Sequence, residues 1–253
     1  MRAAYPLSFQ LYSAREFPPV EEQLPVLARL GYKNVEPFAA LYEAPERFRS
    51  LLDENGLTAL SGHFDLAMLE AEAGRAVDIA KALGIEIIVA PWLNPEDRPA
   101  DAEGWKAIGR RLAMLDERLS AAGLAFAWHT HDFEFLALQD GTFPIEHLLE
   151  GNTVGLELDV AWVVRAGGNP VAWLKKYADR IVAVHVKDVA GEGQNGEQDG
   201  WADLGYGTID WTSIWPAVTA TRARLAILEH DKPVDWQRFA QRSAVEFKAL
   251  RSV

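Results

Sequence analysis

The sequence of 253 residues contains no cysteine, which excludes disulfides, thiolate nucleophiles and cysteine-based zinc or iron–sulfur sites. It also lacks any apolar run of about 18 residues, and its start, MRAAYPLSFQ, lacks the apolar stretch of a signal peptide. No cluster of Lys and Arg stands out, and the net charge is −12. We therefore expect a cytoplasmic protein that has neither a membrane nor a nucleic acid as its partner.

Four segments share one local pattern, in which a helix-like stretch is followed by a glycine and then by a short apolar run. They are ARLGYKNVEPF, DENGLTALSGHF, KALGIEIIVAPW and SAAGLAFAWHTH. The glycine fits the left-handed position after a helix C-terminus, and the apolar run is typical of a buried strand. This pattern predicts helices that alternate with parallel strands.

The same alternation covers the whole chain. Candidate strands span residues 7–13, 34–38, 57–64, 85–92, 124–131, 154–160, 181–188 and 225–231. Segments with helical spacing of apolar residues lie between them, and Pro144, Pro170 and Asp210 mark predicted helix starts. Eight strand–helix units of this kind predict a single α/β domain over residues 1–253, a (β/α)8 TIM barrel. The alternative, an open doubly wound sheet, is disfavoured because no glycine-rich fingerprint follows the first strand.

Ionisable residues gather at the C-terminal ends of the predicted strands, where such barrels form their sites. In FAWHTHDFEF, strand alternation places His129 and His131 on the same face. The other residues of this kind are Glu36, His63, Glu157, Asp159, His185, Lys187, Asp188, Glu229, His230 and Asp231. A parallel barrel buries both faces of its strands, so charged groups there are costly unless they are paired or bind a metal.

Three of these residues lie on neighbouring predicted strands and converge: Asp159, His185 and Glu229. A histidine from the fifth strand would complete a site with four ligands. Mixed nitrogen and oxygen donors suit one divalent ion, Mn, Zn, Co or Mg. A cluster of ion pairs at the rim is the alternative interpretation.

Four motifs now make a family resemblance specific: WHTHDFEF, LELDVAWVVRAGGNPVAWLKKYADRIVAVHVKD, LGYGTIDW and LEHD. The chain resembles the sugar phosphate isomerase/epimerase superfamily, the xylose isomerase-like barrels, over nearly its full length. It is most similar to the branch whose fifth strand reads His-Asn-His-Asp-Phe-Glu-Phe, with Thr130 at the Asn position. The resemblance implies metal ligands at Asp159, His185 and Glu229, together with an acid on strand five. His129 aligns with that acid, which is a departure from the ketose epimerases and their two proton-moving glutamates.

The resemblance implies a metal-dependent isomerase or epimerase that acts on a sugar or a sugar-like cyclic polyol through an enediolate. We take Glu229 as the base that abstracts a proton next to a carbonyl, and His129 as the fourth metal ligand. His131, nearer the rim, would contact substrate or carry a proton. Lys187 would stabilise the enediolate, or else form an ion pair with Glu157.

Three other functions remain open. A dehydratase or lyase that acts on a keto-sugar or a 3-keto-glycoside would share the first step. A barrel that binds sugar without catalysis belongs to another class. Endonuclease IV, a relative with three zinc ions, is disfavoured because the chain has only six histidines and a strongly negative charge.

The expected small-molecule partner is a carbohydrate, and a homo-oligomer is compatible with the sequence. Tryptophan rings at strand ends can stack on a sugar, although ordinary packing is the alternative for each of them. The residues expected to line the substrate site are Glu36, His63, Trp92, Glu157, Trp162 and Trp201.

Overall fold

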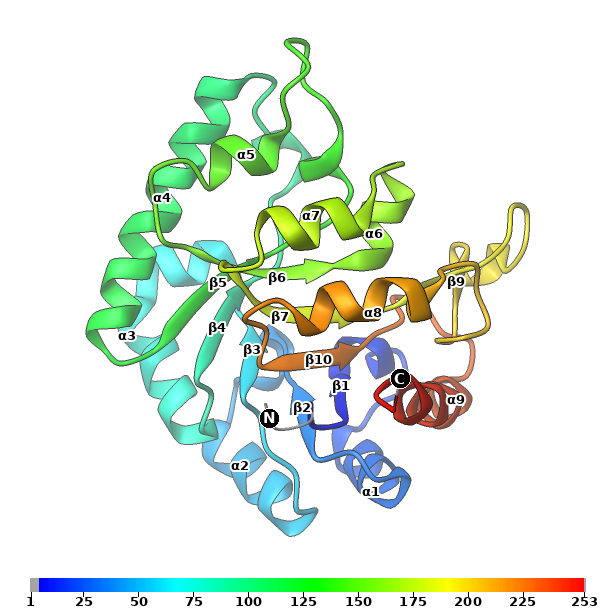
Figure 1. The fold of residues 1–253 in the computed structure, drawn as a ribbon. Helices are drawn as coiled ribbons and strands as arrows, with labels where there is room; N and C mark the ends of the chain where they lie inside the picture. Colours follow the sequence, from blue (N-terminus) through cyan, green and yellow to red (C-terminus); the bar gives the residue numbers. More distant parts are fainter. Residues whose placement is uncertain (1–4, 253) are drawn as a thin grey trace.

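Eight parallel strands form one sheet in the computed structural model, which describes residues 5–252 (Figure 1). They are β1 (Ser8–Gln10), β2 (Asn34–Glu36), β3 (Ser61–His63), β4 (Ile87–Ala90), β5 (Ala125–His129), β6 (Gly155–Asp159), β7 (Ile181–Val186) and β10 (Leu225–Leu228). The strand order β2-β1-β10-β7-β6-β5-β4-β3 wraps the sheet into a nearly closed barrel. The predicted TIM barrel is therefore confirmed, and the open doubly wound sheet is excluded.

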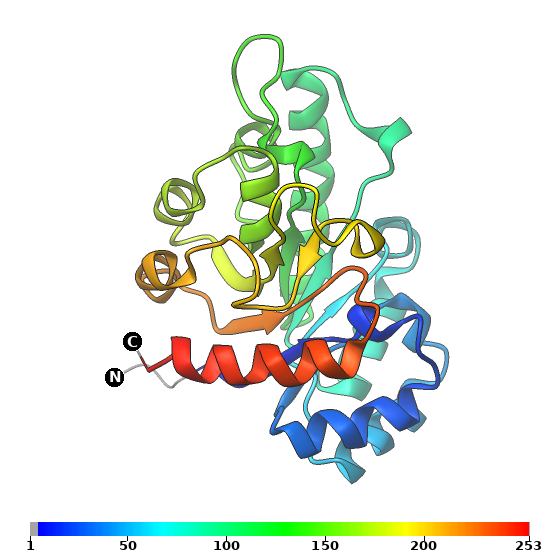
Figure 2. The same ribbon diagram turned by 90° about the vertical axis from the view of Figure 1, so that its right-hand side faces the viewer.

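Helices surround this barrel on its outside (Figure 1). They are α1 (Val20–Leu30), α2 (Pro45–Glu54), α3 (Leu66–Leu83), α4 (Ala102–Ala121), α5 (Pro144–Leu148), α6 (Val160–Arg165), α7 (Pro170–Lys176), α8 (Trp211–Thr219) and α9 (Trp236–Leu250). The last helix, α9, packs beside α1 and α8 and completes the ring (Figure 2). Single 3-10 turns follow several strands: η1 (Leu11–Ala14), η2 (Ala39–Leu41), η3 (Pro95–Asp97), η4 (Phe133–Phe135) and η5 (Gly196–Gln198).

The glycines of the repeated pattern occupy the predicted left-handed positions. Gly31 ends α1 with φ +93°, and Gly84 ends α3 with φ +76°. At Gly31 the backbone N–H donates to carbonyls of the last turn of α1, which would otherwise lack partners. The chain can therefore reverse from each of these helices directly into the next strand.

The seam between β2 and β3 is the weakest join of the barrel. Its one strand bridge pairs Asn34 with Thr58, upstream of β3. The Asn34 side chain adds to the sparse backbone pairing, because its Oδ1 accepts from Thr58 Oγ1 at 3.1 Å and from the Leu60 N–H at 2.9 Å. Further along, the His63 N–H donates to the Pro37 carbonyl at 2.8 Å. Side-chain and single backbone hydrogen bonds together thus close the barrel where the regular ladder stops.

Two predictions about local structure were wrong. Most observed strands are shorter than predicted at their C-terminal ends; β5, for example, ends at His129 and not at His131. The polar strand ends leave the ladder because their side chains turn toward the barrel mouth. The predicted strands also include none between residues 188 and 225, where the structure adds a short antiparallel pair, β8 (Asp188–Val189) and β9 (Trp201–Ala202).

The barrel interior changes from apolar to charged along its axis. A small cluster of apolar side chains fills the interior below the strand ends: Ile87, Val89, Ala127, Ala183, Leu225 and Ile227. The next residues toward the C-terminal ends, among them His129 and His185, are polar and equally buried. A floor without hydrogen-bonding groups therefore supports the polar groups and makes their contacts with one another stronger.

The helix start at Pro170 gives a test of local stability. Asn169 caps α7, because its Oδ1 accepts from the Ala172 N–H at 3.2 Å. Asn169→Ala removes this acceptor and is expected to lower the free energy of unfolding by about 1 kcal/mol. Thermal unfolding measures the effect, and Asn169→Asp, which keeps the oxygen, is the control. An alanine variant as stable as the parent would contradict a capping role.

Candidate active site

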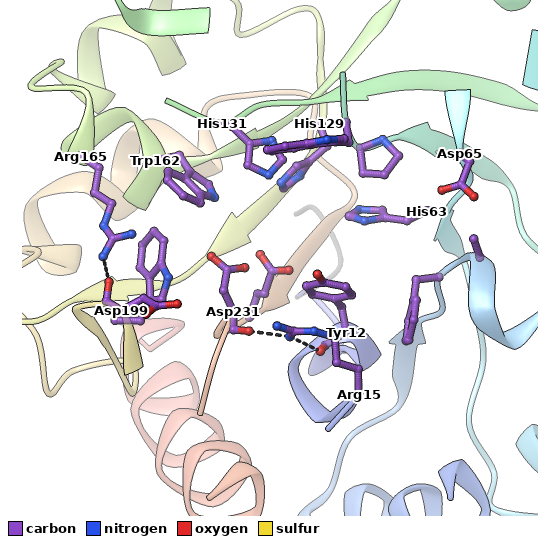
Figure 3. A pocket seen from close by; sticks show the side chains of 16 residues that line it. Tyr12, Arg15, His63, Asp65, His129, His131, Trp162, Arg165, Asp199 and Asp231 are labelled. Atoms are coloured by element: carbon purple, nitrogen blue, oxygen red, sulfur yellow. Dashed lines mark hydrogen bonds between the residues drawn. The ribbon is translucent and has the colours of Figure 1, made fainter. Parts of the chain in front are cut away.

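A pocket of about 500 Å³ opens at the C-terminal ends of the strands (Figure 3), and we call it the mouth pocket. Seven of the predicted site residues line it: His63, Trp92, His129, His131, Trp162, Trp201 and Glu229. Figure 3 shows His63, His129 and His131 along one side of the cavity and Asp231 across from them. The sequence therefore located the pocket correctly along the barrel axis.

Four of the predicted residues meet at the floor of this pocket: His129, Asp159, His185 and Glu229. One ligand atom from each lies within 4.8 Å of the others, and all four side chains are buried. We call this set the rim cluster. The structure brings together the residues that the sequence assigned to a metal, although metal binding itself stays a prediction.

The backbone around Asp159 fixes its carboxylate. Oδ1 accepts from the N–H groups of Ala161 and Trp162, at 2.8 and 3.0 Å, and so caps α6. The Asp159 N–H donates to Thr130 Oγ1 at 3.1 Å. Because these bonds hold one oxygen, Oδ2 is left to face Lys187 and the rim cluster.

Lys187 is a buried ammonium among three carboxylates. Its Nζ lies 2.7 Å from Glu229 Oε2, 3.0 Å from Asp159 Oδ2 and 3.0 Å from Asp231 Oδ1. Burial alone would lower the pKa of Lys187, but these carboxylates, Asp159 first, raise it, so the group stays charged. These three carboxylates thus hold the ammonium beside the rim cluster.

The predicted alternative of an ion pair between Lys187 and Glu157 is wrong. The register pairs Asp159 with His185, so Lys187 lies beyond Asp159 toward the mouth. Glu157 lies two residues deeper on β6. The two side chains therefore occupy different layers of the barrel.

A second group of polar residues, which we call the deep cluster, consists of Gln10, Glu36, His63 and Glu157. Gln10, Glu36 and Glu157 do not line the mouth pocket, whereas His63 reaches from this cluster into it. Glu157 Oε2 lies 2.7 Å from His63 Nε2, 3.0 Å from His129 Nδ1 and 3.1 Å from His185 Nε2. Burial and the nearby Glu36 would raise the pKa of Glu157, but His185 and His63 hold it at about 2. The ionised carboxylate thus orients three imidazole rings.

Glu36 makes a parallel set of contacts in the deep cluster. Its Oε2 accepts from Gln10 Nε2 at 2.8 Å and lies 2.8 Å from His185 Nε2. Neither Glu36 nor Glu157 is among the residues that line the mouth pocket. Both were predicted to contact substrate, and both instead lie below the floor because they point into the barrel one layer deeper.

Two rings of the rim cluster, His129 and His185, also contact the deep cluster, each through one particular nitrogen. His185 points Nε2 at the deep cluster and Nδ1 at Glu229 Oε2, 2.9 Å away. His129 points Nδ1 at Glu157. Partners of this kind fix the tautomer and orientation of a metal-binding imidazole.

A second set, His63, His129, Glu157 and His185, has ligand atoms that also lie within 4.8 Å of one another.

His131 lies beyond β5 but still faces the mouth pocket. Its ring packs edge-on against Trp92 and His129, with centroid distances of 4.8 and 4.9 Å. Burial, with Lys187 adding to it, lowers the pKa of His131 well below its ordinary value. Its Nδ1 is buried without a hydrogen-bond partner among the described residues. A neutral imidazole with a free nitrogen suits contact with substrate or proton transfer.

The three predicted tryptophans differ in exposure. Trp201 is only 1% exposed and packs edge-on against Trp162, and Lys187 Nζ lies 4.7 Å from its ring centroid. Trp92 is 43% exposed. Packing thus accounts for most of the Trp201 surface, whereas Trp92 keeps surface available to a ligand.

The motif LGYGTIDW is held in place by Asp188. Its carboxylate accepts from the N–H groups of Gly205 and Ile209, at 3.0 and 3.1 Å. A Cβ atom at Gly207 would lie 2.1 Å from Asp188 Oδ1, so only glycine fits there. The motif therefore anchors the segment after Trp201 to the end of β7.

The sequence did not predict several other pocket residues, notably Tyr12, Arg15, Arg165 and Asp231 as groups that contact ligand. The guanidinium of Arg15 donates to the carbonyls of Tyr12 and Asp231, at 2.9 and 2.5 Å. Arg165 donates to the carbonyl of Asp199. Arg15 and Arg165 were not predicted because a single arginine outside any motif does not indicate a binding site. Asp231 was listed among the ionisable residues at the strand ends but was given no role.

The fold and the polar mouth define a TIM barrel of the kind whose enzymes work at the C-terminal ends of the strands. Residues 24–247 match the model of the xylose isomerase-like TIM barrel family, and the chain belongs to that family. The predicted superfamily is therefore confirmed, and this is a family of enzymes.

Two proteins with assigned names are similar to this chain in sequence. The chain is 27% identical to the rhizopine catabolism protein MocC of Rhizobium meliloti over 208 residues, which are 74% of this chain and 62% of that protein. It is 23% identical to inosose dehydratase of Lacticaseibacillus casei, with 78% of this chain and 77% of the relative covered. The chain thus spans less than two thirds of the length of MocC.

Two solved structures share the fold. A sugar phosphate isomerase/epimerase from Parabacteroides distasonis superposes with a TM-score of 0.81 at 21% identity, covering 98% of this chain and 95% of the other. The IOLI protein with a bound zinc atom gives a TM-score of 0.77 at 16% identity, covering 98% of each chain. Within residues 5–252, no helix combines the length and apolarity needed to cross a bilayer.

Proposed function

We propose that the chain is a divalent-metal-dependent isomerase or dehydratase that acts on a neutral, sugar-like polyol ketone through an enediolate. The rim cluster carries this proposal, because it places two imidazoles and two carboxylates together at the floor of the mouth pocket. The names of the curated relatives, one of them an inosose dehydratase, agree with a polyol substrate.

The donor set fits a metal. Mixed nitrogen and oxygen ligands, here two imidazoles and two carboxylates, suit Zn, Mn, Co or Mg. His129, Asp159, His185 and Glu229 would hold the ion, with Glu157 and Glu36 orienting the two rings. A bound divalent ion would polarise a ketone oxygen and stabilise the negative charge that develops on it.

The proton steps are assigned to side chains around the mouth pocket. Glu229 removes the proton from the carbon next to the ketone, and the C–H electron pair forms the carbon–carbon double bond of the enediolate. Lys187, 2.7 Å from Glu229, keeps that carboxylate ionised. His131 exchanges a proton with the substrate on the side of the cavity opposite Asp231 (Figure 3).

The fate of the enediolate separates the two reactions. Isomerisation returns a proton to the former carbonyl carbon. In dehydration, the enediolate re-forms the ketone, and its double-bond electrons form a new carbon–carbon double bond as the β carbon–oxygen bond breaks. The proton that Glu229 has taken passes to the departing hydroxyl group, directly or through the neutral His131, and the group leaves as water. One observation favours dehydration as the second candidate: His129 occupies the position of the strand-five acid, so a symmetric pair of glutamate bases is not available for epimerisation.

Electrostatics favour a neutral substrate over a phosphorylated one. Phosphate recognition needs cationic donors that are free to bind it. The mouth pocket is lined by four carboxylates and only two guanidiniums, those of Arg15 and Arg165, so its lining repels a phosphate. The carboxylates are those of Asp65, Asp199, Glu229 and Asp231. Hydroxyl groups, which can donate to carboxylates, match this lining better.

Proton exchange tests the proposal without knowledge of the final product. The metal-loaded protein is incubated in D2O with ketoses, inososes and 3-keto-glycosides, and deuterium uptake next to the ketone is followed by NMR. Uptake is expected for at least one compound and should disappear in chelator. An isomeric product then identifies an isomerase, and an unsaturated product a dehydratase. Absence of uptake and of turnover for every class would leave a non-catalytic sugar-binding barrel as the better explanation.

A further inference from the structure

A second pocket of about 310 Å³ lies directly beside the mouth pocket, and we call it the side pocket. Asp65, Pro91 and Trp92 line both pockets. These residues follow β3 and β4, so the two pockets share one wall at the C-terminal ends of neighbouring strands. The two pockets therefore adjoin at Asp65, Pro91 and Trp92.

The side pocket carries polar groups suited to hydroxyls. Asn94 and Asp97 are exposed and line it without lining the mouth pocket. Asn94 Oδ1 accepts from Trp92 Nε1 at 3.2 Å, which orients the indole. The side pocket is lined by one cationic side chain, that of Arg111. Its Nε and Nη2 donate to the two carboxylate oxygens of Glu70, at 2.8 and 2.9 Å. The lining thus offers acceptors and an amide, and its one cation is already paired.

The junction of the two pockets has two unusual features. Asp65 precedes α3 at the N-cap position but makes no side-chain cap bond. Its exposed carboxylate has no hydrogen-bond or ion-pair partner among the described residues. Trp92 exposes 43% of its surface beside that carboxylate. An aromatic ring next to free carboxylate oxygens is the combination that binds a sugar, because the ring covers C–H groups while the oxygens accept from hydroxyls.

We propose that the side pocket binds the second ring of a neutral two-ring substrate, a glycoside whose first ring reacts over the rim cluster. Trp92 packs on the sugar at the junction, Asp65 accepts from a hydroxyl there, and Asn94 and Asp97 bind hydroxyls of the second ring. This proposal rests on the function proposed for the mouth pocket and names its substrate class.

Binding of matched one-ring and two-ring compounds tests this assignment. Calorimetry compares glucose with cellobiose, and myo-inositol with its galactoside galactinol, on the metal-loaded protein. At least one two-ring compound is expected to bind about tenfold more tightly than its one-ring unit. Asp97→Ala removes a carboxylate that lines only the side pocket and leaves Asn94 in place to orient Trp92. It should weaken two-ring binding by about five- to tenfold and leave one-ring binding unchanged. Glu96→Ala, the matched control, removes a neighbouring exposed carboxylate that lines neither pocket, and should change nothing.

Three results would overturn the proposal: equal affinity for one-ring and two-ring compounds, an unchanged affinity ratio in Asp97→Ala, or no two-ring compound bound at millimolar concentration. Binding is read independently of catalysis, so the two proposals fail separately. Deuterium uptake together with equal binding of one-ring and two-ring compounds would contradict only the second-ring assignment. Tighter binding of two-ring compounds without deuterium uptake would contradict only the enediolate chemistry.

Discussion

Glu229→Gln is expected to lower deuterium exchange and turnover by about 10²–10⁴-fold, the usual contribution of a general base. Glutamine keeps the shape of the side chain and one oxygen donor, but it cannot accept the substrate proton. The Glu229 carboxylate is positioned for this role at the pocket floor, 2.9 Å from His185 Nδ1 and 2.7 Å from Lys187 Nζ. Exchange rates measured by NMR, with thermal unfolding and metal content as checks, report the effect.

Asp231→Asn is the matched control for that experiment. Asp231 also lines the mouth pocket and contacts Lys187, and burial raises its pKa to about 6 despite that ammonium. It lies outside the rim cluster, so its variant is expected to keep most of the exchange activity. A glutamine variant of Glu229 within about threefold of the parent would remove Glu229 from the base role. Loss of exchange in Asp231→Asn alone would transfer that role to Asp231.

His129→Ala is expected to strip the metal, whereas His131→Ala should retain it and lose turnover. His129 is a member of the rim cluster, and its Nδ1 is held by Glu157 at 3.0 Å. His131 lies nearer the opening, outside the rim cluster, with a free nitrogen. Proton transfer by His131 would contribute about 10²-fold or more to the rate. Elemental analysis after dialysis, together with the exchange assay, separates the two effects.

A third histidine supplies the control for these variants. His147 belongs to α5 and contacts Thr142, away from the mouth pocket, so His147→Ala should change neither metal content nor rate. If His131→Ala loses the metal and His129→Ala keeps it, the two assignments are reversed. If neither variant changes metal or rate, the pair is structural.

The sequence predicted the alternation of elements because that signal is local. The glycine after each helix and the apolar run that follows it lie within a dozen residues, and the positive φ at Gly31 and Gly84 shows why glycine stands there. The convergence of the rim cluster was also predictable, since carboxyl ends of neighbouring parallel strands meet at one edge. That argument needs only strand order.

The layering inside the barrel needs more than strand order. The partners of Glu36 and Glu157 depend on the register of strands that are far apart in sequence, such as Asp159 opposite His185. Without that register, Glu157 was predicted to contact substrate or to pair with Lys187. Both predictions placed its side chain nearer the mouth than it lies. Gln10 was missed because one polar residue inside LSFQLYS reads as an ordinary strand position. The β8–β9 pair was missed because strands of two residues have no periodicity to detect.

The seam between β2 and β3 divides the site into halves with different resistance to local opening. Glu36 and His63 face each other across that seam, with Glu36 Oε2 3.1 Å from His63 Nε2. The rim cluster comes from β5, β6, β7 and the end of β10. These four parallel strands are consecutive neighbours in the sheet. Brief separation of the seam, the join that the Asn34 side chain completes, would part Glu36 from His63 and leave the rim cluster assembled. Amide hydrogen exchange should therefore be fastest around Thr58 and Leu60, while the half of the barrel that carries the rim cluster stays protected.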